Sequence, residues 1–366
     1  MVYKFLTILS AAQLLLRRAL CVITNSNITD LGWVQASLPV ANGGLGIRSV
    51  VDLAPSAFLA SAAATLGVQL SLFPECSNPN PFVDATKAIW LDRHPGQPIP
   101  ANRASQHDWD LASITTRANS LLSNASDARH LARLKACMSP HSGDWINALP
   151  ISSCDLRLDD DSVRVAVSLR LGLDLCTPHI CPCGEEVESN GWHGLSCKRS
   201  QGRSVRHYQL NDLIFRSLIR AGVMAVKEPL GLSKVSCIRP DGATLTSWKS
   251  GKKLAWDVTV RDTLCKSYVP LTAVCAGAAA EVADNSKQEK YDLLSNEYCF
   301  CAIACETLGP INSDGLDFLY DLAKKLSTVS GDPRERAFLM QRISMLIQRG
   351  NAVAFAGTFV HCINSV

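Results

Sequence analysis

The sequence predicts an α+β multidomain protein with a helical N-terminal region, a small cysteine-histidine segment and a C-terminal mixed α/β domain. Helical hydrophobic periodicity fills most of the first seventy residues. Six potential metal ligands then fall within residues 176–197, and helical and strand-like runs alternate after residue 200. With 366 residues, of which 47% are hydrophobic, the chain is long enough for two or three domains with buried cores.

The composition excludes several classes of protein. The formal net charge of +3 is too small to identify a nucleic-acid binder by itself. Fifteen cysteines, spread without the dense spacing of a secreted disulfide scaffold, indicate a reducing and therefore intracellular compartment. No window reaches the roughly 18–20 uninterrupted apolar residues of a membrane span. We therefore expect a soluble protein with no membrane partner.

Residues 1–72 are expected to form a helical region. Its first helix, over residues 3–24, imitates a signal peptide, but Gln13 and Arg17 interrupt the apolar run and no small-x-small cleavage site follows. A helix buried in the protein is the better interpretation. A Gly-Gly turn and an Ala-rich helical run complete this region.

Six prolines between residues 73 and 106 predict a linker, because proline interrupts helices and favours an extended connection. Residues 107–175 return to helical periodicity and form a second helical region. Its last helix, over residues 160–175, begins with acidic residues, as the helix macrodipole favours.

The segment 176–200 contains a cysteine-histidine cluster, "CTPHICPCGEEVESNGWHGLSC". The best tetrahedral set for one zinc ion combines a Cys-x-Cys pair with a His-xxx-Cys pair joined by a turn. Either of two further residues could replace one ligand. Free cysteine is mostly a buried apolar residue and is not expected in so polar a stretch, which favours a structural Zn²⁺ site. The preferred ligands are Cys181, Cys183, His193 and Cys197, and the alternatives are Cys176 and His179.

A basic amphipathic helix is predicted over residues 203–221, closed by Gly222. Its apolar residues recur at helical spacing and would face a core, while basic side chains project elsewhere. Such a face can neutralise phosphates with sequence-independent, salt-sensitive affinity, although a solvated helix face is an equal alternative for the helix alone. The basic residues of the stretch are Lys198, Arg199, Arg203, Arg206, Arg216 and Arg220.

Two aspartates, Asp241 and Asp257, are separated by a length of chain that suits a β-hairpin turned at Ser250-Gly251. The hairpin would bring both carboxylates to one end of a sheet, where they could hold Mg²⁺, a hard cation that prefers oxygen ligands. Glu228 is a candidate additional ligand. Turn aspartates are common, so a purely structural role is the alternative for the pair taken alone.

A lysine is expected near this carboxylate pair. The predicted helix over residues 270–297 carries Lys287, Lys290 and Tyr291 on one face, and Lys290 could reach back to the carboxylates if the helix packs on the sheet. Strands near residues 235–247, 253–260 and 299–307, together with two final helices, complete a domain over residues 201–366.

The order of these features resembles the C-terminal region of non-LTR retrotransposon polyproteins that carry a restriction-like endonuclease. "WVQASLPVANGGLGIRS" and "SAFLAS" look like the thumb region downstream of the reverse-transcriptase palm. "VSLRLGLDLCTPHICPCG", "GWHGLSCKRSQGR" and "RHYQLNDLI" resemble the cysteine-histidine motif, a zinc knuckle, and the helix that opens the endonuclease. "RPDG", "WDVTV", "KQEKY", "ACETLG" and "QRISMLIQRGNA" follow in the expected order.

The resemblance implies a PD-(D/E)xK-like nuclease domain. The resemblance implies that Asp241 and Asp257 are ligands of a catalytic Mg²⁺. It also matches Lys290 to the downstream lysine of the family's site. Arg206 and His207 match the family's pair of a basic residue followed by histidine. In that family the nuclease nicks target DNA and the nick primes reverse transcription of the element RNA, so we expect action in the nucleus.

The same resemblance implies that this chain is a fragment, because no Tyr-x-Asp-Asp sequence is present and the polymerase palm is lacking. Two spacings also depart from the common form of the family: the two aspartates lie slightly further apart, and the histidine and cysteine of the zinc motif one residue closer. The alternative is a zinc-stabilised nucleic-acid-binding remnant that no longer cleaves.

Overall fold

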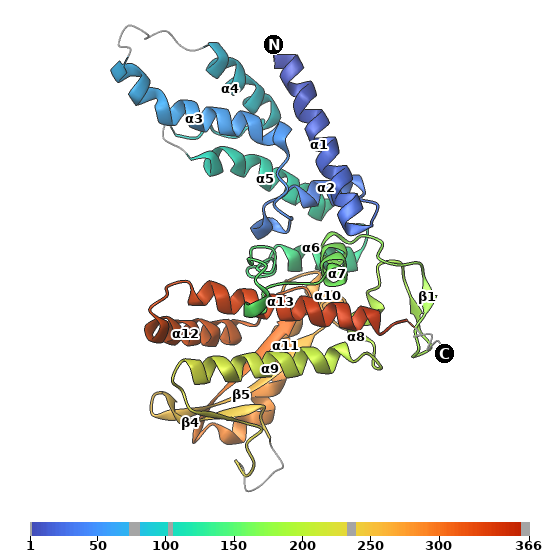
Figure 1. Cartoon of the computed structure of the whole chain (residues 1–366), viewed down its shortest axis with the longest axis vertical. Helices are drawn as coiled ribbons and strands as arrows, with labels where there is room; N and C mark the ends of the chain where they lie inside the picture. The colour runs from blue at the N-terminus through green and yellow to red at the C-terminus, as the bar shows by residue number, and fades with distance from the viewer. Residues whose placement is uncertain (1, 73–80, 102–104, 233–238, 360–366) are drawn as a thin grey trace. The chain divides into compact units, whose positions relative to one another are not determined.

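The computed structural model describes residues 2–72, 81–101, 105–232 and 239–359, with side chains from residue 11 onward. It is an α+β structure with two small sheets, and the chain divides into two compact units, Met1–Asn124 and Ala125–Val366 (Figure 1). The first unit is helical in its described part, and both sheets lie in the second.

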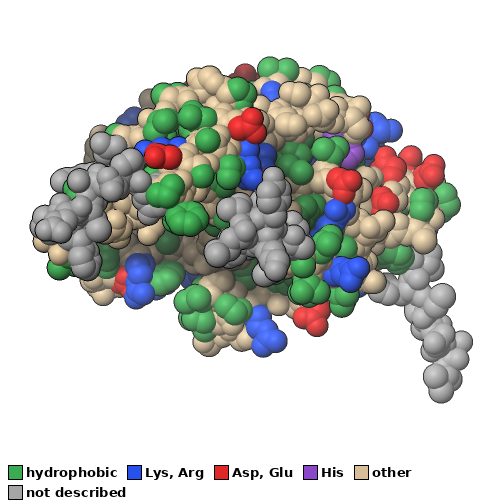
Figure 2. Space-filling view, turned by 90° about the horizontal axis from the view of Figure 1, so that it is seen from above, with side chains coloured by type: hydrophobic (Ala, Val, Ile, Leu, Met, Phe, Trp, Pro, Cys, Tyr) green, Lys and Arg blue, Asp and Glu red, His purple; other side chains and the backbone are tan. Residues whose placement is uncertain are grey.

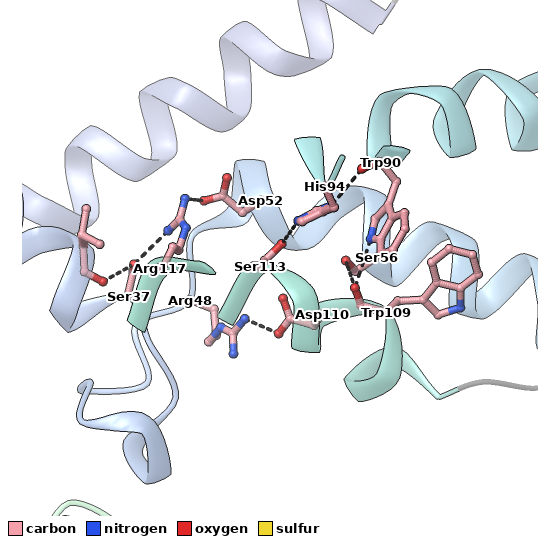
Figure 3. Close-up of polar contacts among 11 residues, drawn as sticks. Ser37, Arg48, Asp52, Ser56, Trp90, His94, Trp109, Asp110, Ser113 and Arg117 are labelled. Atoms are coloured by element: carbon pink, nitrogen blue, oxygen red, sulfur yellow. Dashed lines mark hydrogen bonds and ion pairs between the residues drawn. The ribbon is translucent and has the colours of Figure 1, made fainter. Parts of the chain in front are cut away.

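In the first unit, helix α3 (Val50–Leu72) packs against α5 (Gln106–Ser123) and against α4 (Pro81–Arg93). Two ion pairs join α5 to α3 and to the segment just before α3: Arg48 binds Asp110, and Arg117 binds Asp52 (Figure 3). The elements of the unit are α1 (Val2–Thr24), α2 (Asp30–Ala36), the 3₁₀ turn η1 (Val40–Asn42), α3 (Val50–Leu72), α4 (Pro81–Arg93) and α5 (Gln106–Ser123).

The Pro-rich stretch is not a linker throughout, because residues 81–93 form helix α4. Trp90 is 1% exposed, and its indole Nε1–H donates to Trp109 O at 3.0 Å (Figure 3). The two ring nitrogens of His94 each have a partner. Nδ1 lies 2.8 Å from Trp90 O, and Nε2 lies 2.7 Å from Ser113 Oγ. The prolines lie before the helix, at its first position or after it, where proline is tolerated. Since α5 also belongs to the first unit, the compact units divide within the predicted segment 107–175.

Helix α1 is mostly exposed in its described side chains, so the predicted buried helix is wrong. Leu15 is 65% exposed and Val22 80%, while Leu20 and Thr24 are buried. Helix α3 is long and apolar enough to cross a membrane by length and composition, with 17% of its most apolar window buried, although Ser56, Ser61 and Thr65 interrupt its apolar run. Length and composition do not distinguish such a span from a core helix or a signal sequence. Figure 2 shows hydrophobic side chains scattered among charged ones on one face of the molecule.

The second unit follows the predicted order of helices and strands closely. The predicted basic helix, the hairpin and the two final helices are confirmed. The elements are α6 (Ala128–Cys137), η2 (Ser152–Cys154), α7 (Asp160–Leu171), β1 (His179–Ile180), β2 (Glu186–Val187), α8 (His193–Ser196), α9 (Gly202–Arg220), β3 (Ala225–Lys227), β4 (Gly242–Lys249), β5 (Lys252–Arg261), α10 (Val269–Thr272), α11 (Ala278–Tyr291), η3 (Asp292–Leu294), β6 (Tyr298–Glu306), α12 (Ser313–Ser330) and α13 (Glu335–Ala356).

The larger sheet has the order β3-β4-β5-β6, antiparallel except for the parallel pair β5–β6. Helices α9, α12 and α13 cover one face of it, and α9 and α13 lie side by side (Figure 1). Helix α11 packs on β5 and β6, as a crossover between parallel strands must. The β4–β5 turn places Ser250 at φ 52° and Gly251 at φ 78°, which suits a two-residue hairpin of the type with two positive φ angles.

Alternation along β5 decides where its aspartate points. Leu254, Trp256 and Val258 join the core beneath α9 and α12, whereas Ala255 joins a cluster with Tyr291 at the end of α11. Because side chains alternate along a strand with period two, Asp257 falls on the same side as Ala255. The strand therefore directs this carboxylate toward α11.

Two elements of this unit differ from the sequence prediction. Strand β3 is missing from that prediction, since three residues are too few to produce a periodic signal. The predicted helix over residues 270–297 is broken into α10, α11 and η3, with Gly277 at φ 86° immediately before α11. A left-handed glycine allows the chain to change direction just before the next helix begins. Of the predicted strand near residues 235–247, residues 235–238 lie outside the described residues.

Candidate functional site

The structure brings the four preferred cysteine-histidine ligands together. The ligand atoms of Cys181, Cys183, His193 and Cys197 all lie within 4.8 Å of one another. Cys181 Sγ and Cys197 Sγ are 3.7 Å apart, and Cys183 Sγ is 3.2 Å from His193 Nε2. Tetrahedral zinc with bonds of about 2.3 Å to sulfur and about 2.0 Å to nitrogen requires separations of about 3.8 and 3.5 Å. The group could therefore hold a metal such as zinc.

The two alternative ligands are engaged elsewhere. Cys176 Sγ lies 3.6 Å from the carbonyl oxygens of Glu188 and Ser189. His179 Nε2 contacts Thr358 Oγ1 at 3.1 Å, and its ring stacks on Phe359. The hairpin β1–β2 and the single turn α8 thus select the Cys₃His set.

The local environment of the cysteines bears on their ionisation. Burial raises the pKa of the Cys181 thiol to about 11, whereas a hydrogen bond from the backbone N–H of Glu185 lowers the pKa of Cys183. A bound metal would deprotonate these thiols, because thiolates are its ligands. The turn that carries both cysteines ends at Gly184, whose φ of 94° is a conformation that favours glycine.

The cysteine-histidine module is fixed to helix α13. A Cβ on Gly191 would lie 2.6 Å from Phe355 Cε2, and one on Gly194 would lie 3.0 Å from Phe355 Cα. Side chains at these positions would collide with α13, so glycine permits the close approach. Loss of the module's structure is therefore expected to affect the packing of the whole second unit.

The two aspartates also meet, as the hairpin predicted. Gly242 pairs with Trp256, which places the preceding Asp241 beside Asp257 at one end of the strand pair. Asp241 Oδ2 accepts a hydrogen bond from the backbone N–H of Val258 at 2.7 Å. A Cβ on Gly242 would lie 2.0 Å from the Trp256 ring, so the residue after Asp241 has no room for a side chain.

Asp257 is 3% exposed and is held by helix α11. Tyr291 donates its hydroxyl hydrogen to Asp257 Oδ2 at 2.5 Å, and Lys287 Nζ lies 2.6 Å from Oδ1. Oδ1 is buried and no described donor meets hydrogen-bond geometry with it, so it interacts with Lys287 as an ion pair only. Burial, followed by the bond to Asp257, raises the pKa of Tyr291, which keeps its phenol protonated as a donor.

The lysine at the carboxylate is Lys287, and the assignment of Lys290 is wrong. Lys290 Nζ contacts the Tyr291 hydroxyl at 3.0 Å and no carboxylate among the described residues. The helix presents Lys287 one turn before Tyr291, on the side that faces β5. Lys290 therefore contacts the tyrosine, and the tyrosine contacts Asp257.

His207 completes this group from the other side of the sheet. Its Nε2 lies 3.1 Å from Asp241 Oδ2. The interaction with Asp241 raises the pKa of His207, and the negative charges of Asp241 and Asp257 act in the same direction. The cluster of Asp241, Asp257, His207, Lys287 and Tyr291, named here the carboxylate cluster, therefore combines oxygen ligands with cations.

Glu228 does not join the carboxylate cluster. Its carboxylate binds the guanidinium of Arg239, and both side chains are largely exposed. The backbone of Glu228, at φ 48°, donates its N–H to Asp241 O at 3.0 Å. The residue therefore positions the main chain that carries Asp241, and the prediction of a metal ligand is wrong for its side chain.

Arg206, predicted to bind nucleic acid, is a structural residue. It is 1% exposed, and its guanidinium donates to Leu195 O at 2.8 Å and to Asn351 Oδ1 at 3.1 Å. Burial lowers the pKa of Arg206 to about 10. Gly350 leaves the space for it, since a Cβ there would lie 2.1 Å from Arg206 Cγ. The side chain ties α9 to α8 and α13 and cannot reach a ligand.

Arg206→Ala is expected to lower the free energy of unfolding by about 3 kcal/mol, because it leaves a cavity and unpaired buried acceptors. Arg203→Ala, which changes an exposed arginine on the same helix, should alter it by less than about 0.5 kcal/mol. Urea unfolding of the two variants followed by circular dichroism measures both. Equal stability of the two variants would contradict the structural role.

The other basic residues of this stretch differ in their pairing. Arg216 binds Asp212 at 2.6 Å, Arg220 binds Glu335, and Arg199 donates to Pro182 O at 2.6 Å. Arg203 is exposed and no described carboxylate pairs with it. It lines an open hollow together with Lys198, His207 and Arg261. The prediction of a uniform basic face is therefore too simple.

Sequence reasoning misses two contributors, Lys287 as the ion-pair partner of Asp257 and Arg261 in the hollow. The shared helical face of Lys287, Lys290 and Tyr291 is a usable signal, but it does not say which lysine faces the sheet. Arg261 gives no signal, because a single arginine at the end of a strand is ordinary. Both assignments depend on which strands and helices pack together.

Fold and site define an α+β protein with a Cys₃His group that could bind a metal such as zinc. No protein-family model matches this chain, and the comparison with curated proteins also found no match.

Proposed function

We propose that the second unit is a Mg²⁺-dependent DNA endonuclease of the PD-(D/E)xK type, within a fragment of a non-LTR retrotransposon reverse transcriptase/endonuclease polyprotein. It nicks target DNA in the nucleus, and the nick primes reverse transcription of the element RNA. The observation that carries this proposal is the convergence of Asp241, Asp257 and Lys287 from the start of β4, from β5 and from α11.

The donor chemistry of the carboxylate cluster fits Mg²⁺. Asp241 and Asp257 supply oxygen ligands, and the buried Oδ1 of Asp257 lacks a well-formed hydrogen bond among the described residues. When bound, Mg²⁺ would polarise the phosphodiester and activate a water molecule. Tyr291 and the N–H of Val258 orient the two carboxylates.

Lys287 supplies the positive charge of the proposed reaction. Its ammonium group already lies in an ion pair with Asp257, with the side chain 23% exposed. As negative charge develops on the phosphoryl oxygens, an ammonium group held nearby stabilises that charge without reorganising the site. The His207 side chain is partly exposed, and it lines the neighbouring hollow together with Arg203. DNA that approaches the carboxylate cluster from this hollow therefore meets basic side chains.

Nicking of supercoiled plasmid in Mg²⁺ tests the proposal. We expect the intact chain to convert supercoiled to open-circular DNA, and Asp257→Asn to lower the rate by about 10³-fold or more. Asparagine keeps the size of the side chain and can still accept the Tyr291 hydrogen bond, so the fold should persist. Equal nicking by both proteins, or none by either, would refute the proposal.

A binding-only remnant is the second candidate, and one observation favours it. Lys287 already compensates the charge of Asp257 and Tyr291 donates a hydrogen bond to it, and a purely structural ion pair has the same arrangement. Isothermal titration calorimetry with Mg²⁺ distinguishes the two candidates. A nuclease should show a heat of Mg²⁺ binding that the Asp257→Asn substitution removes, whereas a binding-only remnant should show no such heat.

A further inference from the structure

An open hollow of about 500 Å³ lies beside the carboxylate cluster. It is called the basic hollow here, and its charged residues are Lys198, Arg203 and Arg261, with His207 at its boundary with the cluster. Lys198 directly follows the predicted zinc ligand Cys197, and Arg261 ends the strand that carries Asp257. The basic hollow therefore lies between the cysteine-histidine module and the carboxylates.

The charge of the basic hollow is uncompensated in the part of the chain that the structure describes. None of its lining residues is acidic, and no described carboxylate pairs with Lys198, Arg203 or Arg261. By contrast, Arg216 and Arg220 on the same stretch of chain pair with carboxylates. Three such cations around one open space repel one another, and a bound anion relieves this repulsion.

Arg261 adds a second observation. It is partly buried at the end of β5, and its Nε is buried without a hydrogen-bond partner among the described residues. A buried guanidinium nitrogen without a partner is costly, and a phosphate oxygen is an acceptor that suits the guanidinium. The hydroxyl group of Ser204 lies in the same lining and can donate as well.

We propose that the basic hollow is the subsite for the DNA backbone next to the cleaved bond, with Lys198, Arg203 and Arg261 binding its phosphates. This inference rests on the proposed nuclease function and extends it to the residues that hold the substrate. Asp257 and Arg261 are four residues apart on one strand, about 13 Å along it. DNA that enters through the basic hollow would place a neighbouring phosphate at Asp241 and Asp257.

The mode of binding follows from the kinds of contact. Phosphate contacts carry no direct sequence information, so the basic hollow positions the strand and leaves target choice to other contacts. Each phosphate contact contributes about 0.9 to the slope of log affinity against log salt concentration. Removing Arg203 or Arg261 should therefore weaken binding on all sequences and flatten this slope.

The test separates binding from cleavage. Affinity for a fluorescein-labelled DNA duplex is measured by anisotropy in EDTA across a series of KCl concentrations. Arg203→Ala and Arg261→Ala are compared with the intact chain and with Lys324→Ala, which removes an exposed charge from α12 outside the hollow. We expect each arginine variant to bind about 5- to 10-fold more weakly, with a slope reduced by about 1, and Lys324→Ala to bind as the intact chain does.

Each outcome has one meaning. Unchanged affinity and slope in both arginine variants, with nicking retained, would overturn the subsite and leave the nuclease proposal intact. Weakened binding in a protein that never nicks would refute the nuclease and the placement beside a cleaved bond, and would support phosphate binding by the basic hollow alone. Stronger competition by an RNA duplex than by DNA would overturn the assignment to a DNA backbone. Thermal unfolding of each variant excludes loss of the fold as the cause.

Discussion

Cys181→Ser is expected to abolish stoichiometric zinc binding and to destabilise the second unit. Cys181 is 2% exposed, and its sulfur lies 3.7 Å from Cys197 Sγ in a set that matches tetrahedral coordination. Because the module packs on α13 through Gly191 and Gly194, its loss should lower the free energy of unfolding by on the order of 3–5 kcal/mol. Inductively coupled plasma mass spectrometry gives the zinc content, and urea unfolding gives the stability.

Cys176→Ser is the matched control for this experiment. Cys176 belongs to the same sequence cluster, but its sulfur lies 3.6 Å from two carbonyl oxygens and does not join the four ligand atoms that converge. It should retain about one zinc ion per chain. Retention of zinc by Cys181→Ser together with its loss from Cys176→Ser would mean that a different ligand set holds the metal. EDTA should destabilise the intact chain but leave Cys181→Ser unchanged.

Lys287→Ala is expected to slow nicking by about 100-fold, because it removes the ammonium group nearest Asp257 from the reaction. Lys290→Ala should slow it by less than about 5-fold, since Lys290 contacts Tyr291 rather than a carboxylate. Single-turnover nicking at saturating Mg²⁺ measures both rates. The two substitutions remove the same side chain from the same helix, so each controls for the other.

Stability must be measured beside these rates. Lys287→Ala leaves the buried Asp257 without its cation, which destabilises a protein when no other charge replaces it. Unfolding in the presence of Mg²⁺ shows whether the variant remains folded under assay conditions. A larger loss of nicking in Lys290→Ala than in Lys287→Ala would reverse the assignment of the lysine.

Local patterns predict several features of this protein correctly. The Cys-x-Cys and His-xxx-Cys spacing predicts the four residues that converge, because a hairpin and one helical turn are short enough for spacing to fix their geometry. The Ser250-Gly251 turn predicts the hairpin that aligns Asp241 with Asp257, since two positive φ angles suit this turn and alternation then fixes the register.

Predictions that depend on context are less successful. The prolines around α4 indicate a linker, although Trp90 at 1% exposure anchors a helix between them. The apolar sequence of α1 indicates a buried helix, although its described side chains are mostly exposed. Composition records which residues are apolar, but the partners that bury them belong to other parts of the chain.

By itself the sequence determined the cysteine-histidine cluster, with Cys176 and His179 left as alternative ligands, and the pairing of the two aspartates, because both depend on contacts within short, locally ordered segments. Only the tertiary structure decided that Lys287 rather than Lys290 meets Asp257, that Arg206 is buried against α13, and that Arg203 and Arg261 share one hollow. The physical reason is that a side chain's role follows from which face of its helix or strand is covered, and distant elements of the fold determine that.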